Sequence, residues 1–260
     1  MILNRRVPHP IDMSVETCHS DWSMNTSLSE QAYMAIREKI LRGELALGEP
    51  LSRRAIAGQM GMSLLPVTEA LQRLEAEGLV ESRPRVGTRV KIPSRRDIRD
   101  TFIVREALEV QSARLFAEHA SAARRRELVR KAERVDVLFN RLANSETDAE
   151  FQYLVHSDHC QFHLFIAEST ECELLFHMIE RNQILILNWL YDVAAGRRAL
   201  PRRFHRNLAE LLVSGDVSAA DRGMREHVHY GLEDTLSGML KQTTGDWRRP
   251  RTAGSGLAMR

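Results

Sequence analysis

The sequence predicts a mainly α-helical protein with two domains, a small one of helices and a β-hairpin and a larger all-helical bundle. Three observations predict this fold class. Between residues 27 and 78, apolar residues recur at helical spacing in short segments that end at glycines. Two strand-like runs then flank an Arg-Pro-Arg-Val-Gly turn at residues 83–87. From residue 95 to about 240, longer helical periods continue, with glycine and proline mainly at their junctions.

Capping residues and glycines delimit the first two predicted helices. Ser27 and Glu30 form a capping-box pattern, S-x-x-E, ahead of a helix that ends at Gly43. Ser52 can cap the second helix, because its hydroxyl can accept a hydrogen bond from an N–H of the first turn. Gly61 can then end that helix in the left-handed conformation.

The third predicted helix has one apolar face and leads into the hairpin. Ser63 is its predicted N-cap, and Gly78 ends it. Its apolar face is formed by Val67, Leu71 and Leu74. Residues 79–82 and 88–92 are the predicted strands. Helix, tight turn, helix and basic hairpin is the plan of a winged helix-turn-helix, whose recognition helix enters the major groove of DNA.

An ordered series of residues runs through this first domain. Its members are Ile40-Leu41-Arg42-Gly43, Gly48, Leu51-Ser52, Gly61, Ser63, Pro66-Val67, Glu69-Ala70-Leu71, Arg73-Leu74, Glu77-Gly78-Leu79-Val80 and Gly87-Thr88. With this series, residues 33–90 resemble the N-terminal domain of GntR-family bacterial transcription regulators. Two positions depart from the family pattern, since Leu64 and Thr68 stand where the family usually has arginines that contact bases and phosphates. The resemblance and the basic hairpin together imply a DNA-binding surface formed by Arg53, Arg54, Ser63, Leu64, Thr68, Arg73, Arg83, Arg85 and Thr88.

A run of basic residues covers the predicted wing and the linker after it. Seven basic residues lie between positions 83 and 99, against the single acid Asp97: Arg83, Arg85, Arg89, Lys91, Arg95, Arg96 and Arg99. A charged run is often only a solvated face. Because this one falls on the wing, attraction to DNA phosphates is the favoured interpretation. The net charge is only +2, so contact with DNA must come from such local clustering.

Six helices are predicted for the second domain, at residues 95–120, 122–143, 147–169, 171–195, 199–214 and 217–240. Since Pro93 and Ser94 can end a strand and cap a helix, we expect a DNA-binding domain over 27–93 and a helical domain over 94–240. Residues 1–26 and 241–260 have no helical or strand period, and we expect a flexible arm and a disordered tail there.

Several residue pairs and motifs of this second domain match a known helical domain. They are Arg105-Glu106-Ala107-Leu108-Glu109, Phe162-His163, His205, Gly215-Asp216 and Met224-Arg225-Glu226-His227. With them, the segment is similar to the FCD effector domain of the FadR-like GntR subgroup. That resemblance implies binding of a small-molecule effector, a homodimer and a palindromic operator.

Four histidines form a candidate metal site. His159 and His163 are four residues apart and share one helix face, while His205 and His227 lie on or beside apolar stripes of two other predicted helices. A single buried histidine is more often a hydrogen-bonded core residue than a ligand, so spacing alone favours the core interpretation.

The resemblance raises the case for a metal, because many FCD domains hold a divalent ion with one aspartate and three histidines. His163, His205 and His227 match the three histidines. His159 stands where the aspartate is usual, and the adjacent Asp158 lies about 100° further around the helix. Four imidazoles suit zinc or nickel better than magnesium, so we expect a divalent transition metal.

Arg105 stands where family members often present an arginine to an effector carboxylate. A surface ion pair with Glu109, one helical turn further on, explains it equally well. Both interpretations remain open from the sequence.

Composition and motifs separate the function classes. Three unpaired cysteines, the lack of a signal peptide and the shortness of the longest apolar stretch, 184–191, predict a soluble bacterial cytoplasmic protein without membrane contact. A metal-dependent hydrolase with a helical histidine site is the alternative, but the chain lacks an HD dipeptide and an H-E-x-x-H motif. We therefore expect a non-enzymatic, homodimeric transcription regulator that senses a small organic acid; a pure metal sensor remains the other alternative.

Overall fold

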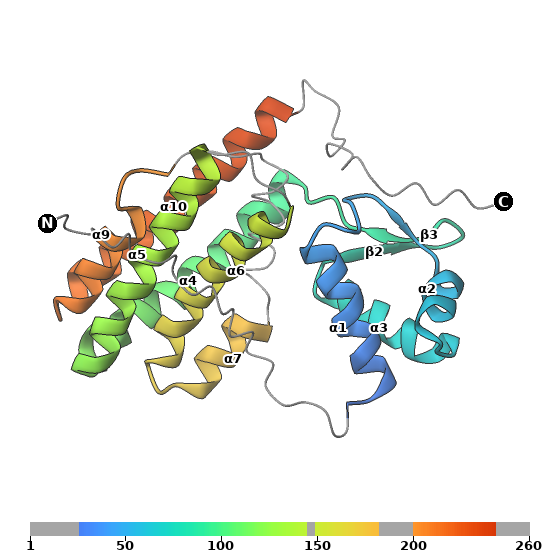
Figure 1. The fold of residues 1–260 in the computed structure, drawn as a ribbon, viewed down its shortest axis with the longest axis horizontal. Helices are drawn as coiled ribbons and strands as arrows, with labels where there is room; N and C mark the ends of the chain where they lie inside the picture. Colours follow the sequence, from blue (N-terminus) through green and yellow to red (C-terminus); the bar gives the residue numbers. More distant parts are fainter. Residues whose placement is uncertain (1–25, 145–148, 182–199, 243–260) are drawn as a thin grey trace, which may run out of the picture.

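The computed structural model describes residues 26–144, 149–181 and 200–242. It contains a small domain with a sheet and a larger helical bundle, which lie at opposite ends of the molecule (Figure 1). The elements of the small domain are α1 (Leu28–Leu41), β1 (Pro50–Leu51), α2 (Arg53–Met60), α3 (Leu64–Ala76), β2 (Val80–Arg83) and β3 (Gly87–Val90). Those of the bundle are α4 (Arg95–His119), α5 (Ala122–Asn144), α6 (Ala149–Glu168), α7 (Glu173–Arg181), α9 (Phe204–Val213) and α10 (Val217–Gln242). The predicted fold class, a winged helix-turn-helix followed by a helical bundle, is confirmed.

The helix starts of the small domain follow the predicted caps with two differences. Ser52 Oγ accepts a hydrogen bond from the Ala55 N–H at 3.3 Å, as expected. Ser27 Oγ likewise accepts from the Glu30 N–H at 3.2 Å, but the Glu30 carboxylate pairs with α3 instead of closing the capping box. The other difference is Ser63, which occupies the N-cap position of α3 with extended backbone while its side chain makes no capping bond within the described chain.

The core of the small domain is formed where α3 packs against α1 and the sheet. The predicted apolar face of α3 is fully buried: Val67, Leu71 and Leu74 are each at most 1% exposed. Gly61 and Gly78 follow α2 and α3 with φ of +63° and +77°, the left-handed conformation that glycine adopts without strain. The glycine positions therefore set the helix ends as predicted.

The sheet is antiparallel, with strand order β1-β3-β2. Its hairpin pairs Val80 with Val90 and Arg83 with Gly87, so the Arg-Pro-Arg turn lies at the tip of the wing. The predicted second strand, 88–92, begins and ends one to two residues early, at 87–90. Strand β1 was not predicted, because two residues are too short for a visible alternation pattern.

The bundle begins at a complete capping box. Ser94 Oγ accepts from the Asp97 N–H at 3.1 Å, and the Asp97 carboxylate accepts from the Ser94 N–H at 2.8 Å. Helix α9 begins at residue 204 rather than 199, after a turn in which Arg203 adopts φ of +60°. Of the helix predicted at 171–195, the structure describes only α7. The rest of it, the predicted arm and most of the predicted tail lie outside the described residues, as does the apolar stretch 184–191.

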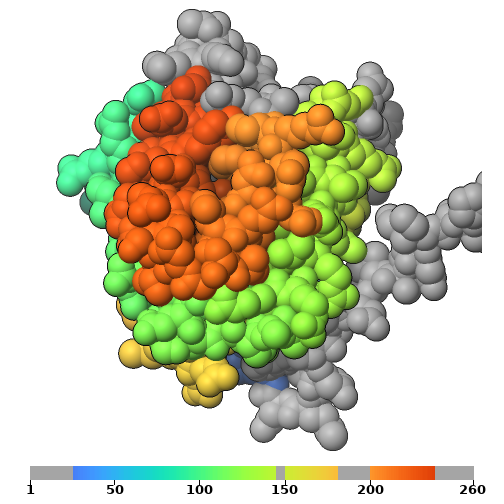
Figure 2. Space-filling model, turned by 90° about the vertical axis from the view of Figure 1, so that its left-hand side faces the viewer, coloured from blue at the N-terminus to red at the C-terminus, as the bar shows by residue number. Residues whose placement is uncertain are grey.

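Helices α4 and α10 pack along each other, and α9 lies between α5 and α10 on one face of the bundle (Figure 2). The core between these helices is filled by large side chains that are at most 2% exposed: Phe102, Phe116, Leu128, Phe162, Ile166 and Leu212. None of the helices in the described part of the chain is long and apolar enough to cross a membrane.

The two domains touch where α1 meets the N-terminal half of α6. Arg42 of α1 hydrogen-bonds both carboxylate oxygens of Glu150, at 2.6 and 2.5 Å, and its guanidinium lies 4.4 Å from the ring centre of Tyr153. The Tyr153 hydroxyl in turn donates to Glu38 of α1 at 3.3 Å. Helix α6 therefore contacts the small domain at one end and the bundle core along the rest of its length.

Candidate DNA-binding surface and histidine centre

The start of α3 presents apolar side chains to solvent. Leu64 is 47% exposed and Leu65 is 66% exposed, while Pro66 beside them is buried. Thr68 is partly exposed and its hydroxyl donates to the Leu64 carbonyl at 2.8 Å. This end of the predicted recognition helix therefore offers two leucines and a threonine that is already hydrogen-bonded to its own helix.

The wing and the start of α2 form a second part of this surface. Residues Arg53 and 82–88 line a groove between them. The Arg53 guanidinium reaches the Thr88 hydroxyl at 3.4 Å. Thr88 itself is only 4% exposed and also shares a hydrogen bond with Ser82 at 3.0 Å, so it holds the wing against α2 instead of facing outward. Arg54, by contrast, is exposed on α2.

Folding neutralises part of the basic run. Arg89 pairs with Glu81 across the hairpin at 2.5 Å, and Lys91 pairs with Asp97 at 2.6 Å. Arg83 and Arg85 are exposed at the wing tip, where Arg85 has φ of +64°. Arg83 also lies 3.9 Å from Glu81. The exposed basic residues of the run are therefore Arg83 and Arg85 at the wing tip and Arg96 and Arg99 at the start of α4.

Arg73 has a different environment from the one predicted. Its guanidinium lies 3.6 Å from the ring centre of Tyr33, hydrogen-bonds Glu30 at 2.5 Å and pairs with Glu77 at 3.3 Å. It lies in the last turn of α3, at the contact with α1. These contacts indicate that Arg73 joins the two helices, an environment that the sequence did not predict.

Three helices bring the four predicted histidines together. His159 and His163 lie on α6, His205 at the start of α9 and His227 on α10. His159, His205 and His227 each offer a ring nitrogen within 4.8 Å of the other two. His163 Nε2 lies 2.9 Å from His159 Nε2. The four predicted histidines therefore lie close together, and His163 joins the group of three through His159.

Two carboxylates hold two of these imidazoles from behind. Asp136 of α5 lies 2.8 Å from Nδ1 of His205. Glu109 of α4 lies 3.0 Å from Nδ1 of His163, a close contact rather than a well-aligned hydrogen bond. Neither carboxylate was singled out as part of the site from the sequence. For Asp136 the only signal in the sequence is its position beside an apolar stripe, next to the buried Val135.

Arg105 is buried beside Glu109, next to the histidine centre. It is 2% exposed and hydrogen-bonds both oxygens of Glu109, at 2.8 and 3.3 Å. The ion pair with Glu109 that the sequence offered as one interpretation is present, but it is buried, not at the surface as expected. Burial alone raises the pKa of Glu109, but Arg105 and His163 outweigh it and lower that pKa to about 2.

Burial keeps His159, His205 and His227 unprotonated at neutral pH. It lowers the pKa of His159 and of His227 well below the ordinary value, and neighbouring histidines lower both further. Burial also lowers the pKa of His205, although Asp136 opposes this shift. His227 stacks on Phe204 at 4.5 Å, and its buried Nδ1 has no hydrogen-bond partner among the described residues.

Two other residues of α6, Asp158 and His156, contact other groups than the four histidines. Asp158 pairs with Arg134 of α5, so it is His159 and not Asp158 that joins the other histidines. His156 is buried against Phe139, with ring centres 5.8 Å apart. Neutral imidazoles with converging nitrogens and an unpartnered buried Nδ1 fit the donor set of a divalent transition metal.

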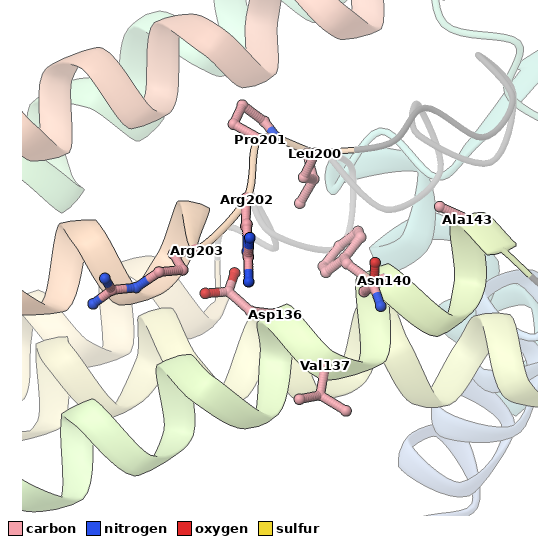
Figure 3. Close-up of a pocket in the computed structure, with 9 residues that line it drawn as sticks. Asp136, Val137, Asn140, Ala143, Leu200, Pro201, Arg202 and Arg203 are labelled. Atoms are coloured by element: carbon pink, nitrogen blue, oxygen red, sulfur yellow. The ribbon is translucent and has the colours of Figure 1, made fainter.

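A cavity of about 540 Å³ lies next to the centre (Figure 3). Its lining comes from α5 and from the turn before α9: Asp136, Val137, Phe139, Asn140, Ala143, Leu200, Pro201, Arg202 and Arg203. Asp136 and Arg202 point toward one another across it. Two residues that line the cavity also contact His205. Asp136 pairs with His205, and the Phe139 ring stacks on the His205 ring with centres 5.5 Å apart.

Comparison with known proteins finds relatives of the whole chain. A probable D-xylose utilization operon transcriptional repressor of Paenarthrobacter nicotinovorans is 28% identical over 207 residues, covering 78% of this chain and 86% of the relative. The HTH-type transcriptional repressor RspR of Escherichia coli K12 is 25% identical over 238 residues, covering 90% of this chain and 98% of the relative. The HTH-type transcriptional regulator LutR of Bacillus subtilis is 27% identical over 227 residues, covering 78% and 98%.

Solved structures share the fold. E. coli McbR/YncC superposes with a TM-score of 0.65 at 20% identity, covering 83% of this chain and 100% of that one. A putative GntR regulator from Rhodococcus sp. RHA1 also gives a TM-score of 0.65 at 20% identity, covering 81% and 98%.

Two family models match the two domains. The model of bacterial regulatory proteins of the gntR family matches residues 28–90, and the FCD domain model matches residues 100–230. The chain therefore belongs to the GntR family of bacterial transcription regulators, in the group that carries an FCD domain after its winged helix-turn-helix.

Proposed function

We propose that this regulator binds a palindromic operator as a homodimer and that a small carboxylate effector, bound in a metal-containing helical domain, sets its affinity for that operator. In this proposal residues 27–93 bind DNA, and residues 94–240 bind the effector and dimerise. The observation that carries it is the presence, on one chain, of an outward-facing helix and wing and of a centre of four neighbouring imidazoles, three of them buried. An effector can change operator affinity only by binding two arrangements of the dimer unequally.

In the DNA-binding part we assign phosphate contacts to Arg53, Arg54, Arg83 and Arg85. Support comes from the exposure of Arg54 and the wing-tip arginines, and from the groove between Arg53 and the wing. Base contacts fall to the exposed first turn of α3, which begins after Ser63. A helix of this kind reads base edges with its N-terminal residues.

In the helical part we assign a divalent ion, zinc or nickel, to His159, His163, His205 and His227. The unprotonated nitrogens of His159 and His227 support the assignment, since metals bind only neutral imidazole. When bound, such an ion supplies a Lewis-acidic position for an effector carboxylate. The adjacent cavity, with Arg202 and Asn140 in its wall, is where we place the rest of the effector.

The alternative of a hydrolase is disfavoured by the carboxylates. Glu109 contacts His163 and Arg105, and Asp136 contacts His205 and the start of α9. Within the described part of the chain, both carboxylates that touch the centre are thus already committed, and neither is placed to act as a general base. We therefore propose that the centre binds and senses without catalysing a reaction.

The wing assignment is tested by replacing Arg83 and Arg85 with alanine and measuring operator binding at several salt concentrations. Each lost phosphate contact lowers the slope of log K against log salt by about 0.9 and weakens binding to all sequences. Arg130, an exposed arginine of α5, provides the matched control R130A. A double variant with the salt slope of the wild type removes the wing from the DNA contact.

The effector assignment is tested by titrating operator DNA with chelator-treated protein, with zinc-loaded protein and with zinc-loaded protein plus a panel of small carboxylates. We expect a carboxylate to change the operator affinity of the loaded protein only. A change caused by zinc alone, with no response to any carboxylate, identifies a pure metal sensor. If neither addition alters the operator affinity, the sensing role of the helical domain is excluded.

A further inference from the structure

We propose that Asp136 is a positioning residue of the histidine centre. Its carboxylate holds His205 in the tautomer whose Nε2 can bind metal, and the same carboxylate caps the start of α9. The proposal rests on the metal centre of the proposed function. It adds a residue outside the ligand set, on a helix that contributes none of the four histidines.

Both oxygens of Asp136 are occupied by donors from α9. Oδ1 accepts from the backbone N–H of His205 at 3.0 Å and lies 2.8 Å from Nδ1 of the same residue. Oδ2 accepts from the Arg206 N–H at 3.0 Å. A carboxylate can only accept, so His205 must carry its hydrogen on Nδ1. In a neutral imidazole the lone pair is then on Nε2, which is left for the other side of the ring.

The same carboxylate caps α9. Arg203, the N-cap residue of α9, has a left-handed backbone and makes no side-chain capping bond within the described chain. Asp136 supplies the missing acceptor from α5, and its negative charge lies at the positive end of the helix dipole. Because α9 packs between α5 and α10 (Figure 2), this contact also fixes where His205 stands relative to His227.

Glu109 provides a contrast within the same centre. It approaches Nδ1 of His163 at 3.0 Å but shares its charge with Arg105 and caps no helix. Asp136 alone of these two carboxylates combines a tautomer-setting contact with a helix cap.

D136N is the informative substitution. An asparagine has one acceptor oxygen, so one of the His205 and Arg206 donors must face an amide NH₂. When that NH₂ faces the imidazole, it favours hydrogen on Nε2, and this tautomer cannot bind metal through Nε2. Loss of such a carboxylate partner typically costs 10- to 100-fold in metal affinity.

The experiment uses full-length wild type, D136N, the conservative variant D136E and the control E133Q. Glu133 also lies on α5 and pairs with Arg206, but it does not contact His205 in the described structure. Zinc affinity is measured by competition with a chromophoric chelator, and the visible spectrum of added cobalt(II) reports the ligand environment. Melting temperatures are recorded in chelator. A long-range ¹H–¹⁵N spectrum of chelator-treated wild type, assigned with H205Q, reports the His205 tautomer.

We expect wild type and E133Q to bind zinc alike, D136N to bind about 10- to 100-fold more weakly with an altered cobalt spectrum, and D136E to recover part of the loss. The apo wild type should show hydrogen on Nδ1 of His205. If D136N only lowers the melting temperature and binds zinc as tightly as wild type, Asp136 is a structural cap and the inference fails. Hydrogen on Nε2 in the wild type overturns it even if D136N does not fold. A wild type that binds neither ion removes the proposed metal centre itself, and the inference with it.

Discussion

At the scale of single residues, burial decides the charge of His156 in the helical domain. His156 is 6% exposed on α6, and burial lowers its pKa to about 3. In the unfolded chain the same side chain titrates near 6.5. Below that pH the unfolded state takes up a proton that the native state refuses, so stability is lost as pH falls from about 6.5 toward 3.

We predict that H156Q reduces this acid sensitivity. One proton bound only by the unfolded state contributes a slope of about 1.4 kcal/mol per pH unit well below pH 6.5, and the variant should lack it. Urea unfolding in chelator at pH 7.5, 6.0 and 5.0 measures the difference. H119Q, which replaces an exposed histidine at the end of α4, is the control and should keep the wild-type slope. Equal slopes for wild type and H156Q would contradict the prediction.

The two departures from the family pattern at the start of α3 lead to a prediction about base preference. Leu64 is exposed and can contact a thymine methyl group, but it cannot make the bidentate guanine contact worth about 1–3 kcal/mol. We expect L64R with T68R to raise affinity for sites with guanine at the contacted position. Selection of bound sequences from random DNA measures the preference of both proteins. A wild type that already selects guanine there would show that other side chains read this position.

At the scale of elements, one arginine joins the ends of two helices. The Arg125 guanidinium donates to the carbonyls of Ala117 and Ala120 at the end of α4, at 2.7 and 2.9 Å. It also donates to the carbonyl of Val213, the last residue of α9, at 2.8 Å. These carbonyls lie at helix C-termini, where a cation is favourable.

R125A should therefore destabilise the bundle. Hydrogen bonds to a charged group contribute about 1.5–3 kcal/mol each but not additively, so we expect a loss of about 3 kcal/mol. Chemical unfolding of the full chain measures it. R126A, the exposed neighbour on the same helix, should stay within about 0.5 kcal/mol of wild type. A loss of similar size in both variants would mean that the helix-end contacts of Arg125 contribute little.

At the scale of the whole molecule, α6 connects the histidine centre to the DNA-binding domain. His159 and His163 lie in its C-terminal half, and Glu150 and Tyr153 contact Arg42 and Glu38 of α1. A shift of α6 that favours one arrangement of the centre can thus be transmitted to α1. Such a path counts as coupling only if altering it changes how one site responds to the other.

We predict that R42A weakens this response more than it weakens DNA binding itself. An exposed ion pair contributes at most about 1 kcal/mol, so the effect of zinc or a carboxylate on operator affinity should shrink by up to roughly fivefold. Operator titrations with and without these additions measure the ratio. R114A, which breaks the Arg114–Asp221 pair within the bundle, should leave the ratio unchanged. An unaltered ratio in R42A would exclude this contact as the route.

The sequence by itself determined the local architecture. Helix starts at Ser52 and Ser94, left-handed ends at Gly61 and Gly78, and the apolar stripe of α3 all follow from interactions within a few residues. The family resemblance, carried by the same short motifs, also placed the four histidines in one candidate site. Local propensity and spacing are readable in one dimension, and so the predicted helix starts, helix ends and apolar stripe agree with the structure. The four-histidine metal site stays a prediction.

Only the tertiary structure decided which charged and polar groups meet. Asp136 and His205 are 69 positions apart, and Arg73 reaches Glu30 across 43. Likewise Glu81 neutralises Arg89 only because the hairpin places them opposite each other. These pairings depend on how helices and strands pack, which local spacing does not encode. For that reason the sequence identified the histidines of the centre but not the carboxylates that hold them, nor the true environments of Arg73, Thr88 and Arg105.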